Sequence, residues 1–174
     1  ECDMARNTTI IFTSDHGDML GEYGLWYKMS LREWSCRIPM VVHNPNRFEA
    51  RRIPQPVAHV DVLPTLIDIA HEATCVAKPS VIDPLNGRSL LPLCDGDASQ
   101  DPDACVSEYL GEGTGEPMLM IRRGHYKYIS CITDTEPLWD LQPYQNECKT
   151  YAAEDPREML GSFRRDACEA GGCG

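Results

Sequence analysis

The residues best suited to chemistry lie in one stretch, residues 13–28. A carboxylate and an imidazole stand side by side at Asp15 and His16, glycines follow them, and the stretch closes on Lys28. Carboxylate oxygens and imidazole nitrogens bind divalent cations, glycines permit tight backbone turns, and an ammonium group attracts anions. The pattern therefore indicates a site for a divalent cation and an oxyanion. A charged turn capped by Asp15 accounts for the same residues and stays open as the alternative.

A strand is expected to position this pair. Residues 8–12 read Thr-Thr-Ile-Ile-Phe, a continuous β-branched and aromatic run that favours a parallel strand buried on both faces. Open α/β folds place their ligands beyond the carboxyl ends of such strands. Asp15 and His16 follow that end, so we expect them at the carboxyl edge of a sheet.

Two more elements are expected in the first half of the chain. Residues 39–42, Pro-Met-Val-Val, predict a second short strand. Residues 60–70 predict a helix, with Pro64 tolerated in its first turn. Prolines and aspartates then make residues 73–103 rich in loops. The apolar positions of the expected helix follow helical spacing and are Val60, Leu63, Leu66, Ile67 and Ala70.

The second half predicts a small antiparallel sheet. Strand-like runs occupy residues 105–110, 118–122 and 126–132, and residues 123–125 form a tight link between the last two runs. A helix is expected at residues 156–165, ahead of a glycine-rich end.

Composition limits the partners. The chain has 174 residues, and its net charge of −11 repels phosphate backbones and anionic lipids. No apolar run approaches the roughly 18–20 residues that a membrane-spanning helix needs. We therefore expect no nucleic-acid partner and no membrane association, and, with no visible export signal, a cytoplasmic location. The nine cysteines are odd in number and include no Cys-x-x-Cys pair, so we expect most of them to be reduced.

The start of the chain suggests a piece of something longer. It opens on Glu1, not on methionine, and a strand-like run follows almost at once. A strand taken from a larger sheet loses neighbours, so we expect residues 8–12 to present an exposed apolar edge that promotes aggregation.

A family resemblance joins these segments. Residues 14–29, Ser-Asp-His-Gly-Asp-Met-Leu-Gly-Glu-Tyr-Gly-Leu-Trp-Tyr-Lys-Met, resemble the second metal-binding segment of type I sulfatases in the alkaline phosphatase superfamily, and most of all that of choline sulfatases. Four further segments resemble the same family in the same order, and the resemblance extends over about residues 8–151. These segments are residues 59–66, 87–93, 107–109 and 120–129.

The resemblance implies roles for four residues. Asp15 and His16 would be ligands of one divalent cation, Ca²⁺ or Mg²⁺/Mn²⁺, and Lys28 would contact the sulfate oxygens. A Lewis-acid metal and an ammonium group supply positive charge where a departing sulfate ester develops negative charge. Glu108, with Glu112 as a substitute, would face the trimethylammonium group of choline. A solvated strand residue is an equally good interpretation of Glu108.

Two parts of the family pattern are missing from the sequence. The family's nucleophile is a formylglycine made within a Cys/Ser-x-Pro-x-Arg motif. No cysteine or serine of this sequence fits that motif. Cys36 comes nearest, but its proline, Pro39, lies one place too far along the chain. The Asp-Asp strand end that completes the metal shell is also missing. We therefore expect the nucleophile upstream, at most half of a metal site in this chain, and no activity from this chain alone.

The resemblance also implies a fold and a division of the chain. The fold is α/β, the C-terminal part of an alkaline-phosphatase-like sandwich, with a small antiparallel β subdomain and a C-terminal helix. Residues 1–100 would close the catalytic α/β domain. Residues 101–174 would form the antiparallel-sheet subdomain and tail.

The expected function is that of part of a sulfuric ester hydrolase, with choline sulfate and water converted to choline and sulfate. Its partner would be a small-molecule sulfate ester. Intact relatives form homo-oligomers, but we do not expect one for this chain, because the tail through which choline sulfatases contact neighbouring subunits is missing. A phosphodiesterase or phosphonate hydrolase of the same superfamily is one alternative, since the same ligands serve phosphoryl chemistry. A non-catalytic, acidic, cysteine-rich interaction module is the other.

Overall fold

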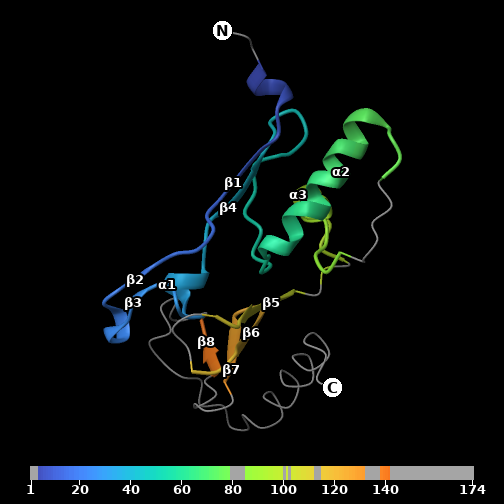
Figure 1. Ribbon diagram of the computed structural model, residues 1–174. Helices are drawn as coiled ribbons and strands as arrows, with labels where there is room; N and C mark the ends of the chain where they lie inside the picture. Colours follow the sequence, from blue (N-terminus) through green and yellow to red (C-terminus); the bar gives the residue numbers. More distant parts are fainter. Residues whose placement is uncertain are drawn as a thin grey trace. The chain divides into compact units, whose positions relative to one another are not determined.

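The computed structural model describes residues 4–78, 85–99, 101, 103–111, 115–131 and 138–141. The chain divides into two compact units, one made of residues 1–11 and 41–103 and the other of residues 12–40 and 104–174. Figure 1 shows their elements along the chain. The helix expected at 156–165 lies outside the described residues, and the division into 1–100 and 101–174 stays a prediction. Among the described residues, every helix is too short or too polar to cross a bilayer.

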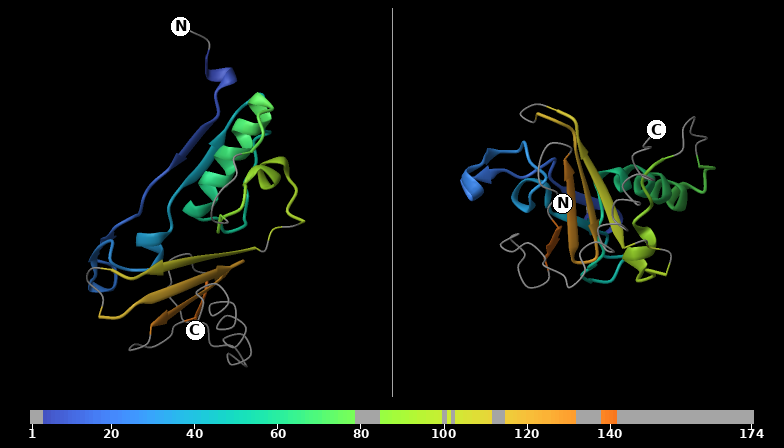
Figure 2. Two further views of the ribbon diagram at one scale, coloured as in Figure 1. Left: turned by 45° about the vertical axis from the view of Figure 1, so that its right-hand side comes forward. Right: turned by 90° about the horizontal axis from the view of Figure 1, so that it is seen from below.

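Two strands pair ahead of the site. After a short 3-10 helix, η1 (Met4–Asn7), strand β1 (Ile10–Thr13) pairs with β4 (Met40–His43), and the two run side by side in Figure 2. Both expected strands are therefore confirmed, each shifted by one or two residues. The expectation of burial on both faces is wrong, because alternate side chains of β1 and β4 are exposed. In the described part of the chain β1 pairs with β4 alone.

Helix α2 (Val62–Thr74), entered through the 3-10 helix η3 (His59–Asp61), confirms the helix expected at 60–70. Its apolar stripe is not covered, because Val60, Leu63 and Leu66 are exposed.

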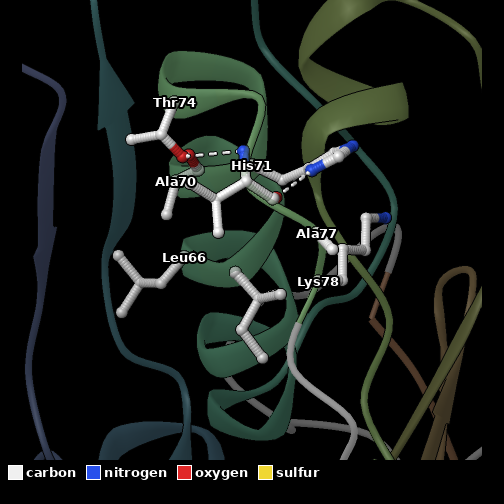
Figure 3. A pocket seen from close by; sticks show the side chains of 8 residues that line it. Leu66, Ala70, His71, Thr74, Ala77 and Lys78 are labelled. Atoms are coloured by element: carbon white, nitrogen blue, oxygen red, sulfur yellow. Dashed lines mark hydrogen bonds between the residues drawn. The ribbon is translucent and has the colours of Figure 1, made fainter.

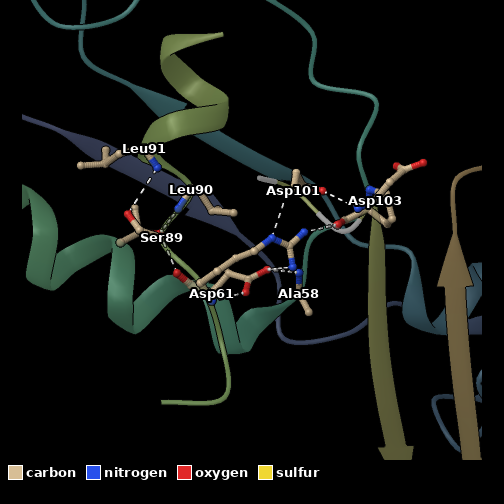
Figure 4. Close-up of polar contacts among 10 residues, drawn as sticks. Ala58, Asp61, Ser89, Leu90, Leu91, Asp101 and Asp103 are labelled. Carbon is tan, nitrogen blue, oxygen red and sulfur yellow. Dashed lines mark hydrogen bonds and ion pairs between the residues drawn. The ribbon is translucent and has the colours of Figure 1, made fainter. Parts of the chain in front are cut away.

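The buried side of α2 is polar. Asp61 begins the helix, with one carboxylate oxygen accepting the Ala58 N–H at 2.9 Å and the other the Arg88 N–H at 2.9 Å (Figure 4). The Thr65 hydroxyl donates to the Asp61 carbonyl at 2.6 Å and accepts the Leu90 N–H at 2.8 Å. Each buried polar group is thereby satisfied, and the chain around Leu90 is fastened to the start of α2.

Leu90 is followed by a helix that was not predicted from the sequence, α3 (Leu91–Asp95). Its residues lie in the stretch expected to be loop. Gly96 ends it in the left-handed conformation, with φ of 91°, which glycine adopts without cost. Leu91, Leu93 and Cys94 are buried, so packing rather than helix propensity decides this element.

The second unit contains a four-stranded antiparallel sheet in the order β5-β6-β7-β8 (Figure 2, yellow to orange). Strands β5 (Ala104–Tyr109), β6 (Met118–Arg123) and β7 (Tyr126–Cys131) confirm the expected sheet. Gly124, with φ of 51°, supports the two-residue turn between β6 and β7. Strand β8 (Leu138–Asp140) was not predicted, because three residues carry too little periodicity to read.

The sheet holds the segment that carries the candidate site. Leu31 packs with Met120, Ile129 and Leu141 in one buried cluster. Next to it, the fully buried Lys127 on β7 donates to Glu33 of helix α1 (Glu33–Cys36) at 3.0 Å. A buried lysine needs such a partner, since an unpaired charge in the interior is costly. Residues 12–40 are thus anchored to the sheet by both apolar packing and a buried ion pair.

Candidate functional site

Asp15 and His16 lie just after strand β1, separated from its last residue by Ser14. The His16 N–H donates to one carboxylate oxygen of Asp15 at 2.9 Å, and the Ser14 hydroxyl donates to the His16 carbonyl at 2.7 Å. The backbone hydrogen bond from His16 is the main reason that the pKa of Asp15 lies below its usual value. Asp15 is therefore a carboxylate, and with its side chain 84% exposed it is accessible to a ligand.

The imidazole of His16 is oriented by the next residue. Its Nδ1 lies 2.8 Å from the Gly17 carbonyl oxygen, which can only accept, so Nδ1 carries the proton. In the neutral ring Nε2 then presents a lone pair, and it lies 3.3 Å from the second carboxylate oxygen of Asp15. If the ring is protonated instead, the same two atoms form an ion pair, which is the charged-turn interpretation.

The spacing of these two atoms suits a divalent cation. Neighbouring ligands of an octahedral ion with bonds of roughly 2.0–2.1 Å lie about 3 Å apart. Nε2 of His16 and the Asp15 oxygen have nearly this separation, and an oxygen with a nitrogen is a normal donor set for such ions. They fit a metal as two ligands of a larger shell. No group of three or more His, Cys, Asp or Glu side chains able to hold a metal occurs among the residues that the structure describes.

A short hairpin brings Lys28 toward this pair. Strands β2 (Met19–Leu20) and β3 (Trp26–Tyr27) are antiparallel, with Met19 opposite Tyr27, and the 3-10 helix η2 (Glu22–Gly24) lies between them. Lys28 therefore leaves the hairpin at the end where residues 15–18 enter it. Its side chain is exposed and makes no ion pair or side-chain hydrogen bond within the described part of the chain. A lysine in this state is available to an anion.

Ser35 of α1 binds the segments on both sides of this hairpin, one before β2 and one after β3. The Gly17 N–H donates to the Ser35 carbonyl at 2.7 Å, and the Ser35 hydroxyl donates to the Lys28 carbonyl at 2.6 Å. Only glycine fits at position 17, because a Cβ there would lie 2.1 Å from the Trp34 carbonyl oxygen. Sequence reasoning missed Ser35, since a lone serine in a helix of four residues carries no recognisable pattern.

Glu108 lies on β5, opposite Leu119, and is exposed. Among the described residues no hydrogen bond or ion pair joins it to Asp15, His16 or Lys28. Its substitute Glu112 lies outside those residues. The structure thus brings Asp15 and His16 into contact and places Lys28 at their end of the hairpin, while the role of Glu108 stays a prediction.

A cavity of about 300 Å³ lies elsewhere, at the C-terminal end of α2 (Figure 3). Apolar side chains such as Leu66 and Ala70 line it, and His71 on its wall is tied by Nδ1 to the Val76 carbonyl at 2.7 Å. None of the predicted site residues lines this cavity.

Comparison with known proteins gives the same result as the motif. Residues 3–72 match the sulfatase family. Choline-sulfatase from Rhizobium meliloti is 38% identical over 154 residues, which are 88% of this chain and 28% of that protein. The chain belongs to the sulfatase family. Arylsulfatase K from Rattus norvegicus is 33% identical, again over 88% of this chain and 28% of that protein.

Solved sulfatase structures have the same fold. The structure of a 2-O GAG sulfatase superposes with a TM-score of 0.73 at 27% identity, over 92% of this chain and 35% of that one. The architecture is therefore part of the sulfatase fold, with small helices and antiparallel sheets, as expected from the resemblance. This sulfatase-family chain spans a little over a quarter of the length of the curated relatives that it matches.

Proposed function

We propose that the protein that carries this chain hydrolyses sulfate esters, and that Asp15, His16 and Lys28 belong to its active site. The observation that carries the proposal is the contact between the Asp15 carboxylate and Nε2 of His16, 3.3 Å apart, at the end of the hairpin that Lys28 leaves. Family membership supports sulfate esters over other anionic substrates.

The residues of the chain have distinct tasks in this proposal. Asp15 stays ionised because its pKa is lowered, mainly by the His16 N–H, and so offers an anionic oxygen. His16 offers the lone pair of Nε2 as long as Gly17 holds the proton on Nδ1. A divalent cation bound by the two would supply Lewis-acid stabilisation of the sulfate oxygens. Lys28 adds an ammonium charge for the same oxygens, and charge placed in advance is effective in catalysis.

The nucleophile does not come from these 174 residues, since no Cys/Ser-x-Pro-x-Arg motif occurs in the sequence. We propose that a formylglycine and the remaining metal ligands come from other parts of the protein that carries this chain, and that this chain alone is inactive. The matched relatives are more than three times as long as this chain, so a longer protein of this kind has enough further residues to supply both groups.

Choline sulfate is the substrate we propose. The similarity to a choline-sulfatase supports it, and the exposed carboxylate of Glu108 is a suitable partner for a quaternary ammonium group.

The test begins with the sequence upstream of Glu1 and uses the full-length protein. We expect hydrolysis of choline sulfate, and a loss of about 10²–10³-fold in kcat/KM for Asp15→Ala, His16→Ala and Lys28→Ala. His43→Ala, which removes an exposed histidine from β4, is the matched control and stays within twofold of the wild type. Faster turnover of an aryl sulfate contradicts the choline assignment. Faster turnover of a phosphonate monoester contradicts sulfate-ester hydrolysis as the main activity.

A further inference from the structure

We infer that Ser35 is a positioning residue that holds Lys28 beside the Asp15–His16 pair. This inference rests on the proposed function and adds to it a residue that touches neither substrate nor metal. Ser35 is 2% exposed, and two of its oxygens bind the two segments that flank one hairpin, one before β2 and one after β3. Its carbonyl accepts the Gly17 N–H at 2.7 Å, and its hydroxyl donates to the Lys28 carbonyl at 2.6 Å.

The Lys28 peptide is held by two donors. Its carbonyl oxygen accepts the Ser35 hydroxyl at 2.6 Å and the Ser30 N–H at 2.7 Å, so both lone pairs are used. The orientation of the peptide plane after Lys28 is therefore set. A lysine side chain has several rotatable bonds, so the direction of its Cα–Cβ bond decides which volume the ammonium group can reach.

The backbone before Lys28 explains why a restraint is needed. Tyr27 has φ of 68°, in the left-handed region that a tyrosine enters only at a cost. Such strain persists where surrounding contacts hold it, and it relaxes when they are removed. The Ser35 hydroxyl is the side-chain contact that holds this corner, because the Ser30 N–H bond belongs to the same local turn.

Ser35 itself has a firm base. It belongs to α1, whose Glu33 forms the buried ion pair with Lys127 of β7 at 3.0 Å. The antiparallel sheet is thus linked through α1 and Ser35 to the Lys28 carbonyl and, on the other side, to Gly17. Gly17 is also the residue whose carbonyl orients His16. One buried serine therefore fixes both the ammonium side and the metal side of the site.

Ser35→Ala separates these two sides. It removes the hydroxyl donor to Lys28 but keeps the backbone carbonyl that accepts the Gly17 N–H. We expect kcat for sulfate-ester hydrolysis by the full-length protein to fall about tenfold, with metal affinity within twofold of the wild type, since small displacements of a charged group are expensive in catalysis. Ser35→Thr keeps a hydroxyl and restores most of the rate. Ser99→Ala, which removes an exposed serine hydroxyl from the loop after α3, is the control, and it leaves kcat within twofold.

Two readouts separate positioning from general loss of structure. In a Lys28→Ala background, Ser35→Ala changes the rate by less than twofold if Ser35 acts through Lys28, and by the same tenfold if it merely supports the fold. In NMR relaxation of the full-length protein, Ser35→Ala lowers the order parameter of the Met29 amide, which shares a peptide plane with the Lys28 carbonyl, and leaves that of Gly17 unchanged.

The outcomes are distinct. An unchanged order parameter of the Met29 amide, or equal losses with and without Lys28, overturns the role of Ser35 whatever the activity. A wild-type protein that hydrolyses no sulfate ester overturns the proposed function, while the relaxation data still decide whether Ser35 holds Lys28.

Discussion

The sheet β5–β8 buries apolar side chains, whereas helix α2 exposes them. In the sheet, Ile121 is 2% exposed and Met120 and Ile129 pack against Leu31. In α2, Leu63 is 53% exposed, and the buried side carries Asp61 and Thr65. The sheet packs against Leu31, which belongs to the same unit.

The difference teaches which part of the chain depends on other residues. An α/β layer is covered by elements on both faces, and α2 with β1 and β4 supplies only a part of one. The chain spans 28% of its curated relatives, and 35% of the solved 2-O GAG sulfatase chain. We expect the apolar face of α2 to be covered by residues outside these 174.

The largest effect should come from the core of the sheet. Ile121→Ala is expected to lower the free energy of unfolding by about 2–5 kcal/mol, because it leaves a cavity. Leu63→Ala on α2 removes a side chain of similar size that is already 53% exposed, and should change the free energy of unfolding by less than about 0.5 kcal/mol. Urea denaturation of both variants measures the difference, and equal losses would show that α2 is as well covered as the sheet.

The next largest effect on stability should come from the hydrogen bonds of Asp61 at the start of α2. Asp61→Ala leaves the Ala58 and Arg88 N–H groups without their acceptor, and we expect a loss of about 1–3 kcal/mol. Asp18→Ala removes an exposed carboxylate as the control. If the two variants unfold at the same urea concentration, the hydrogen bonds of Asp61 do not stabilise α2.

The exposed face of α2 should affect solubility more than stability. Leu63→Lys and Leu66→Lys are expected to leave the unfolding free energy of this chain within about 0.5 kcal/mol and to slow its aggregation, since they break an apolar patch. Light scattering at rising protein concentration measures this. In the full-length protein the same changes should be destabilising, and a neutral effect there would mean that nothing covers this face.

The smallest effect should be a pH dependence in α2. Burial works against ionisation of Asp68, but hydrogen bonds from Lys78 and Ser89 outweigh it, so the pKa of Asp68 lies below its usual 3.8. A lowered pKa stabilises the fold above the unfolded value, and this contribution is lost as the pH falls below 3.8 through the folded value. Asp68→Asn should therefore flatten the stability profile below about pH 4, with Asp18→Asn as the control. If the stability profile of Asp68→Asn keeps the wild-type slope, Asp68 is not the source of the pH dependence.

Much of the local structure could be predicted from the sequence. The helix at 60–70 and the strands of the sheet follow from periodicity, which reflects interactions between close neighbours. The tight link after β6, expected at residues 123–125, follows from Gly124, and the structure narrows it to residues 124–125. The pairing of Asp15 with His16 is predictable for the same reason, because adjacent residues after a strand end need no distant contact to meet.

Only the tertiary structure decided the rest. Helix α3 forms because Leu90 is fastened to Thr65 and Leu91 and Leu93 are buried, contacts between residues far apart in the sequence. The exposure of the α2 stripe likewise could not be read from its spacing, since spacing marks an apolar face but not what covers it. Ser35 gains its place from hydrogen bonds to Gly17 and Lys28 that exist only once the hairpin has folded onto α1. The sequence by itself determined which residues carry charge and apolar surface, and long-range packing determined which of them meet.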